Sequence, residues 1–291
     1  MFIYFNKYRE EGKILKKTRF LSICLMIIIT ISITGCTIVD DGLVKFGLRN
    51  QDFEYIKDNK VDRIIIQSAR DTGFRFVVTD ANAINDIYET LRKGKVEEKK
   101  TSLAPDYIFE IHIGEEIRYY NYVAYLDESG VGNFYDDNSS YGISKNLDET
   151  ILQNLSFIRK PRDFDNIYYK SILMVLEAKK SELTSPDNKV GVDIAGDLDC
   201  LKYMFSVELE NFKKDLDETV SNTKLIENNK EEFNTIITVK NKGYSSKVFK
   251  TTITVDNRKD KVYETYYIEG AYEYKDWKIK ISEPNKKPNE W

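Results

Sequence analysis

The chain has 291 residues, of which 41% are hydrophobic and 32% are charged, and its formal net charge is −4 at pH 7. Residues 1–35 hold six Lys or Arg and two Glu, which leaves 38 basic and 46 acidic residues in 36–291, a net charge of −8. This acidic balance argues against nucleic acid as a partner, because nucleic acids attract basic patches. The single histidine, His112, excludes a multi-histidine zinc site within this sequence.

The N-terminus has the pattern of a secretory signal. Basic residues lead into an apolar run from Phe20 to Ile33, which has 14 residues. A transmembrane helix needs roughly 20 residues, whereas the apolar region of a signal peptide has about 7 to 15. We therefore expect this segment to be a signal peptide over residues 1–35, and to be removed.

The run ends in Ile33-Thr34-Gly35-Cys36, which resembles the lipobox of bacterial lipoproteins: a branched apolar residue, two small residues and a cysteine. The resemblance implies cleavage between Gly35 and Cys36 and attachment of a diacylglyceryl group to the Cys36 thiol. Two acyl chains would hold the protein firmly on a bilayer. The alternative is an ordinary secretory signal, or a short membrane anchor, that contains a cysteine by chance.

The composition is rich in Ile, Lys, Asn and Tyr and has only five Pro, which suggests a low-GC Gram-positive source. In such a cell the anchored chain would face outward from the cell membrane. Cys24 leaves with the signal peptide and Cys36 carries lipid, so Cys200 remains alone and no intrachain disulfide is expected.

The next 22 or so residues, 37–58, show little periodicity and are interpreted as part of a tether that begins at Cys36. From Val61 the pattern predicts strands at 63–67 and 73–78, and a helix that Asp80 caps and Gly94 ends. Residues 95–100 are expected to be a charged loop. Pro105 opens a half-buried strand to Ile113, and strands at 117–126 and 131–135 follow. A capping box at Asn146 predicts a final helix that ends before Pro161.

This order of strands and helices, with Pro105-Asp106-Tyr107 opening the third strand, resembles the YhfM-like domain of Gram-positive lipoproteins. The segment 84–94 and the sequence Tyr141-Gly142-Ile143-Ser144 contribute to the resemblance, which covers residues 59–159. It implies a small α+β domain on an envelope lipoprotein whose biochemical role is not established. It implies no catalytic residue.

The remainder, 160–291, is predicted to hold two helices followed by an antiparallel sheet. The helices cover 163–183 and 198–220, with a loop over 184–196 between them. Strands are expected at 233–240, 247–255, 261–269 and 271–281, with hairpin turns at 241–243 and 257–260. The arrangement resembles that of NTF2-like domains. The predicted fold class is therefore α+β, with two small domains that each pair an antiparallel sheet with one or two helices; a single shared core is the alternative.

Candidate sites are few. His112, beside Glu110 on a strand, is expected to be a solvated or edge residue. The Ser221-x-x-Lys224 spacing matches that of penicillin-binding enzymes, but it lies at the end of a helix and lacks the partner motifs. Two acidic groups, Asp136-Asp137-Asn138 and Asp193 with Asp197 and Asp199, lack the alternating register of a calcium loop and are interpreted as solvated turns.

Tyrosines are concentrated on two sets of strands and could bind a glycan or a protein, although we expect most of them to pack in the core. They are Tyr119, Tyr120, Tyr122 and Tyr125 in the first set, and Tyr263, Tyr266, Tyr267, Tyr272 and Tyr274 in the second.

The sequence therefore predicts a lipid-anchored envelope protein that is not an enzyme and has no cofactor or metal. Its partners would be the membrane, through the anchor, and an envelope protein or cell-wall glycan. A carboxylate-dependent hydrolase is the alternative, since a glycosidase needs only two Asp or Glu. Solute capture for a transporter would need a larger two-lobed fold.

Overall fold

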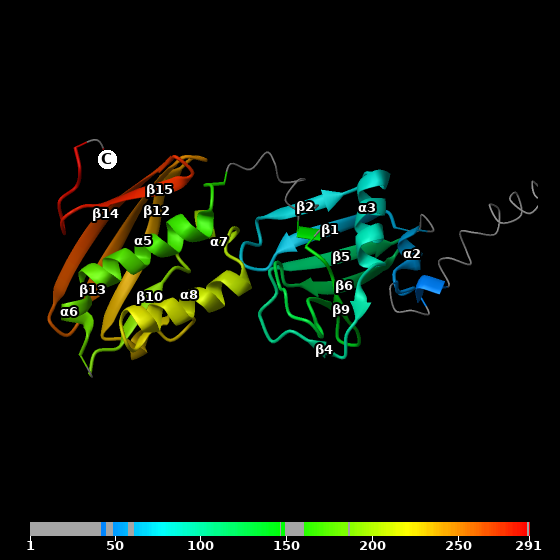
Figure 1. Cartoon of the computed structure of the whole chain (residues 1–291), viewed down its shortest axis with the longest axis horizontal. Coiled ribbons are helices and arrows are strands. Elements are labelled where there is room, and N and C mark those ends of the chain that lie inside the picture. The colour runs from blue at the N-terminus through cyan, green and yellow to red at the C-terminus, as the bar shows by residue number, and fades with distance from the viewer. Residues whose placement is uncertain are drawn as a thin grey trace, which may run out of the picture.

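The computed structural model describes residues 42–44, 49–57, 61–145, 147–148, 160–185, 187–289 and 291. The predicted signal peptide, Cys36 and most of the helix expected after Asn146 lie outside these residues. None of the helices within the described ranges is long and apolar enough to cross a bilayer. The fold is α+β, as predicted, and its elements form two halves that lie side by side (Figure 1).

The N-terminal half is built on a seven-stranded sheet in the order β2-β1-β5-β6-β8-β9-β3, and every neighbouring pair in it is antiparallel. The helix α3 lies along this sheet (Figure 1). A short parallel pair, β4 with β7, is separate from it. The bounds are α2 Glu54–Lys57, β1 Arg63–Ser68, β2 Arg75–Val78, α3 Ala81–Leu91, β3 Lys95–Val96, β4 Lys99–Lys100, β5 Tyr107–Ile113, β6 Glu116–Tyr122, β7 Val131–Gly132, β8 Phe134–Tyr135 and β9 Ser140–Gly142.

The core of this half lies on the face of the sheet to which alternate side chains of β1 and β5 point. Ile64 pairs with Ile111 and Ile66 with Phe109, and all four side chains are buried. The predicted start of α3 is confirmed, because the Asp80 carboxylate accepts hydrogen bonds from the backbone N–H groups of residues 82 and 83. The charged segment 95–100, expected to be a loop, instead contributes the two-residue strands β3 and β4.

The C-terminal half has a six-stranded sheet in the order β11-β10-β12-β13-β14-β15. Helices α5 and α8 lie together along this sheet (Figure 1), and α5 makes contacts with β13, β14 and β15. The bounds are α5 Phe164–Ala178, α6 Lys180–Leu183, β10 Val190–Asp193, α7 Leu198–Leu201, α8 Ser206–Thr219, β11 Thr223–Leu225, the 3-10 helix η1 Lys230–Glu232, β12 Thr235–Tyr244, β13 Val248–Asn257, β14 Val262–Glu273 and β15 Asp276–Ile281.

The last four strands are antiparallel, as predicted, but the sheet as a whole is mixed. The segment expected to be a loop between the two helices contains β10, which pairs in parallel with both β11 and β12. Val190 and Val192 are fully buried in it. The prediction of a loop is wrong because a four-residue strand that contains Gly and Asp gives almost no periodic signal. Its interior position in the sheet comes from long-range pairing with β11 and β12.

One predicted turn and one predicted strand boundary are also displaced. Residues 241–243 form a β-bulge inside β12 rather than a hairpin: Gly243 has φ 137°, and its N–H donates to Asn241 Oδ1 at 2.9 Å. The turn follows, where Ser245 Oγ accepts from the N–H groups of residues 247 and 248. The predicted break at Gly270 is likewise wrong, because β14 runs through it and the turn comes at Tyr274 and Lys275, both with positive φ.

The predicted helix over 198–220 is divided in two. Phe205 has an extended backbone with φ −105° and ψ 149°, and it separates α7 from α8. Its side chain is not part of the helical stripe expected from its spacing. Instead Phe205 belongs to the buried cluster of the N-terminal half, together with Tyr107 and Phe109.

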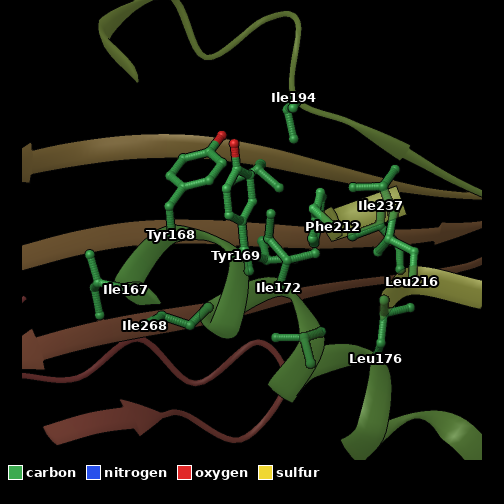
Figure 2. Close-up of a cluster of buried hydrophobic side chains, with 14 of the residues drawn as sticks. Ile167, Tyr168, Tyr169, Ile172, Leu176, Ile194, Phe212, Leu216, Ile237 and Ile268 are labelled. Carbon is green, nitrogen blue, oxygen red and sulfur yellow. The ribbon is translucent and has the colours of Figure 1, made fainter. Parts of the chain in front are cut away.

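Buried side chains of the described residues form two large clusters. One draws on residues 53–147 together with Phe205, and the other on residues 164–277. Figure 2 shows the second cluster, which includes Ile172 and Leu176 of α5 and Ile237 of β12. Phe205 is therefore a side chain of the C-terminal half that is buried in the core of the other half.

Candidate functional site at the junction of the two halves

The junction is centred on Asp106, which directly precedes β5. Its Oδ1 atom accepts hydrogen bonds from Arg70 Nη1 at 2.5 Å and from the backbone N–H of Ser206 at 2.8 Å. Its Oδ2 atom accepts one from the backbone N–H of Ala124 at 2.8 Å. The carboxylate is almost fully buried, at 2% exposure. Burial raises the pKa of Asp106, and the Arg70 guanidinium opposes this shift.

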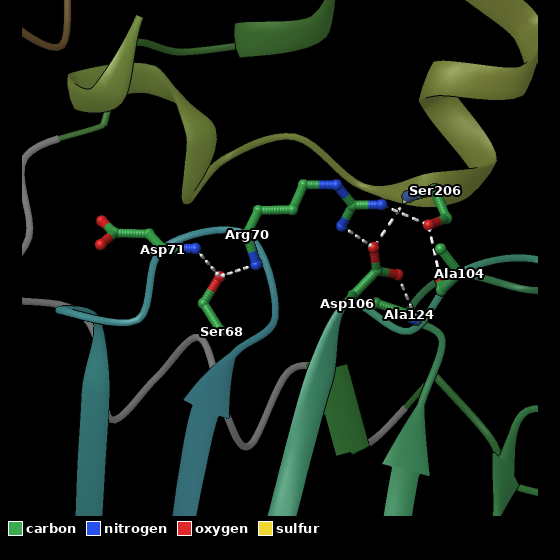
Figure 3. Close-up of polar contacts among 7 residues, drawn as sticks. All are labelled: Ser68, Arg70, Asp71, Ala104, Asp106, Ala124 and Ser206. Atoms are coloured by element: carbon green, nitrogen blue, oxygen red, sulfur yellow. Dashed lines mark hydrogen bonds and ion pairs between the residues drawn. The ribbon is translucent and has the colours of Figure 1, made fainter. Parts of the chain in front are cut away.

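Arg70 and Ser206 complete the bridge, which Figure 3 shows. Arg70 Nη2 also donates to the Ser206 hydroxyl, and that hydroxyl in turn donates to the carbonyl of Ala104 at 2.6 Å. The loop that carries Arg70 is held by Ser68, whose Oγ accepts from the N–H groups of residues 70 and 71. Three segments far apart in the sequence therefore meet at one satisfied ion pair.

An aromatic contact lies beside this bridge. The ring of Phe205 is 5.0 Å from that of Tyr125 and 6.2 Å from that of Tyr107. Lys160 Nζ lies 5.3 Å from the Phe205 ring, a cation–π distance. Burial lowers the pKa of this lysine. The polar bridge and the aromatic contact together fasten the start of α8 to the N-terminal half.

A groove of about 250 Å³ runs between α5 and α8, close to the junction. Glu208 and Tyr169 line it, and the Tyr169 ring stacks on Phe212 at 4.5 Å. Within the described part of the chain, Glu208 Oε2 and the Tyr169 hydroxyl are covered from solvent and have no hydrogen-bond partner. Burial raises the pKa of Glu208 to about 7, and Lys160 opposes this shift.

A second groove, of about 660 Å³, lies between the C-terminal part of α8 and β11. Its lining includes Lys213, Asp217 and Glu227. Thr223 and Asn229 also line it; the Thr223 hydroxyl and Asn229 Oδ1 are covered from solvent and have no hydrogen-bond partner among the described residues. Its volume lies in the range of roughly 300 to 1,000 Å³ that is typical of small-molecule sites.

None of the sequence-predicted candidates lines the α5–α8 groove, and among them Lys224 alone lines the second groove. His112 is buried at 7% exposure on the interior strand β5, so the expectation of a solvated or edge residue is wrong. Its ring nitrogens lie 3.4 Å from Arg63 Nη2 and 3.3 Å from Glu110 Oε2. Lys224 lines the second groove, while Ser221 is exposed outside its lining.

The two acidic groups have local roles. Asp136 accepts from the N–H groups of residues 138 and 139 in a turn, and Asp193 forms an ion pair with Lys230 at 2.9 Å. Asp197 is buried rather than solvated, because it accepts from the Tyr168 hydroxyl and from the N–H of Asn241. Over the described ranges, no group of three or more His, Cys, Asp or Glu is placed to hold a metal ion.

Most of the singled-out tyrosines are buried or half-buried, as expected. Tyr119, Tyr263 and Tyr274 are the exposed ones, at 57%, 62% and 96%. Sequence reasoning missed Arg70, Ser206, Glu208 and Tyr169, because their significance comes from contacts across more than 30 residues. Only Asp106 carried an earlier signal, as part of Pro105-Asp106-Tyr107.

These observations define an α+β protein in which buried polar bridges fasten two halves together. Residues 57–161 match the family described as YhfM protein, so the chain contains a YhfM-like domain. The predicted domain, residues 59–159, lies within the matched segment. No curated protein and no solved structure is similar enough to match. The resemblance of the C-terminal half to NTF2-like domains stays a prediction.

Proposed function

We propose that this protein is a lipid-anchored module at the outer face of the cell membrane, where it binds an envelope protein or a cell-wall component without catalysing a reaction. The proposed location rests on the signal pattern and on Cys36 in the lipobox-like sequence. The YhfM-like domain is consistent with an envelope protein, on the resemblance described above.

The hydrogen bonds and burial of the carboxylates decide between a binding function and a hydrolytic one. Asp106, Asp148 and Asp197 each accept hydrogen bonds from donors that belong to the fold. A glycosidase needs two carboxylates that face each other across a cleft, about 5 to 10 Å apart. In the α5–α8 groove, Asp165 and Asp215 are exposed and only Glu208 is partly buried. The grooves thus offer unpaired hydrogen-bonding groups without a buried carboxylate pair, which favours binding.

The anchor is tested by Cys36→Ser. We expect the wild type to fractionate with membranes and to incorporate labelled fatty acid, and the variant to lose both properties. Cys200→Ser is the matched control, because Cys200 is buried in the fold. A Cys36→Ser protein that stays acylated and membrane-bound would contradict the proposed address.

Binding is tested by cross-linking in intact envelopes, followed by purification of the acylated full chain. We expect enrichment of a defined protein or glycan relative to an unrelated lipoprotein. The competing hydrolase is tested by incubating the full chain with purified wall glycan and measuring new reducing ends. If the wild type produced new reducing ends and Glu208→Gln abolished this activity, the non-catalytic proposal would be overturned.

A further inference from the structure

We infer that the α5–α8 groove is a binding site for a primary ammonium group, with Glu208 and the Tyr169 hydroxyl as its ligands. This inference rests on the proposed function, because it names the chemistry by which the module recognises part of its partner. The hydrogen bonds at Asp106 involve neither Glu208 nor Tyr169, although Glu208 also accepts from the backbone N–H of Phe205 at the start of α8.

The first reason is the pair of unsatisfied polar atoms. Tyr169 is 7% exposed and lines the groove, and its hydroxyl has no hydrogen-bond partner in the described ranges. Glu208 Oε2 in the same lining also lacks one. Leaving a buried polar group unpaired costs about 1 to 3 kcal/mol, and more for a charged group. A ligand that pairs with both atoms recovers that cost.

The second reason is charge. The lining contains three carboxylates, Asp165, Glu208 and Asp215, and one lysine, Lys170. An ammonium group offers three N–H donors and a positive charge, so it can donate to the carboxylate and to the phenolic oxygen together. An anionic ligand would be repelled by the excess of carboxylates in this lining.

The third reason is the position of the neighbouring lysine. Lys160 Nζ lies over the rings of Phe164, Tyr203 and Phe205, at 5.3 to 5.7 Å from their centroids. It moderates the charge of Glu208 but makes no hydrogen bond with Glu208 Oε2. Glu208 is itself half-buried and belongs to the lining of the groove.

The groove size limits the ligand. A volume of about 250 Å³ is below the roughly 300 Å³ at which small-molecule pockets begin. It suits the end of a chain, such as an ammonium group on a few methylene groups, rather than a whole sugar or nucleotide. Phe212, stacked against Tyr169, supplies an apolar wall for those methylenes.

Titration calorimetry of the detergent-solubilised full chain tests the inference. The probe is N-acetyl-lysine methylamide, and the matched neutral probe is N-acetyl-norleucine methylamide, which lacks the ammonium group. We expect saturable binding of the first probe alone. Affinity should rise between pH 6 and pH 8 as Glu208, which faces Lys160, Asp165 and Asp106, loses its proton.

Two variants separate the site from general charge. Glu208→Gln should weaken the lysine probe about tenfold, because a charge-assisted hydrogen bond is lost. Tyr169→Phe should weaken it several-fold while leaving the melting temperature unchanged or higher, because the hydroxyl has no partner in the fold. Glu218→Gln, an exposed position on the same helix, should leave binding unchanged.

Absence of binding by the lysine probe would overturn the inference, as would equal binding of both probes. So would a Tyr169→Phe protein that melts lower but binds normally, because the hydroxyl would then serve the fold through a buried water. None of these results bears on capture of a partner in intact envelopes, so failure of the ammonium site and failure of the binding module are distinguishable.

Discussion

Asp106 and Ser206 are 100 residues apart in the chain, yet the Asp106 carboxylate accepts the backbone N–H of Ser206 at 2.8 Å. The same oxygen receives Arg70, so one atom joins a loop of the N-terminal sheet to the first turn of α8. A carboxylate beside the start of a helix also meets the positive end of the helix dipole. The contact therefore fixes the position of α8 as well as its first residue.

Asp106→Asn should destabilise the protein by about 3 kcal/mol, because it leaves the Arg70 guanidinium in a buried site without its countercharge. The Arg70 side chain is only 18% exposed, so water compensates little. Urea unfolding measures the loss. Glu116→Gln is the control, since the Glu116–Arg118 pair is exposed and should be worth under about 1 kcal/mol. Equal losses in both variants would show that the junction contributes no more than a surface pair.

Phe205→Ala should weaken the packing between the two halves, so that they move more independently of each other. The side chain is 3% exposed and buried with Tyr107 and Tyr125, so its removal should cost about 3 to 5 kcal/mol. We expect faster proteolysis near residues 103–105 and 202–205 and a larger radius of gyration by small-angle scattering. Phe212→Ala is a matched control, because Phe212 is equally buried but lies within the C-terminal core. If both variants changed the scattering alike, Phe205 would have no special role at the junction.

Much of the N-terminal half can be predicted from sequence, for reasons that particular residues make clear. The strand at Tyr107 alternates buried and less buried side chains, and the Asp80 cap is a local interaction that spans three residues. Phe205 shows the limit. Its spacing with Leu201 and Leu209 fits a helix, but its burial in the other half forces an extended backbone at that position. A periodic pattern does not say which core an apolar residue enters.

The candidate site was less predictable for a related reason. Glu208 resembles the other acidic residues on a charged helix face, and only the fold places it beside Tyr169 in a groove. His112 was misjudged because alternation shows which face a residue occupies but not what covers that face. Here Arg63 and Glu110 enclose it.

Stability should depend on pH through Asp148, which accepts the Tyr122 hydroxyl at 2.6 Å. Burial raises the pKa of Asp148 from 3.8 to about 6. The folded state therefore holds a proton that the unfolded state has lost between about pH 4 and 6, and this group's contribution falls as pH rises through that window. We expect the difference in unfolding free energy between wild type and Asp148→Asn to shift against the wild type by on the order of 2 kcal/mol from pH 4 to pH 7.

Urea titrations of both proteins at the two pH values measure that shift, and the other titrating groups cancel in the comparison. Asp127→Asn is a suitable control, because Asp127 is exposed and forms an ion pair with Lys145 at the surface. A wild type that gains relative to Asp148→Asn on going to pH 7 would show that the buried carboxylate is better stabilised when charged.

Gly270→Ala should destabilise the protein by about 1 to 3 kcal/mol, because overpacking a well-filled core forces neighbours to shift. A Cβ at this position in β14 would lie 2.6 Å from Ile167 Cδ1 of α5 and 3.1 Å from Trp277 Cε3 of β15. The glycine thus lets α5 approach the sheet, rather than marking the boundary between two strands that the sequence predicted. Ile167→Val removes the clashing methyl group, so the double variant should recover part of the loss. Gly196→Ala, with nothing within 4 Å, should be nearly neutral. If Gly270→Ala cost no more than Gly196→Ala in thermal unfolding, the close approach of α5 would not depend on this residue.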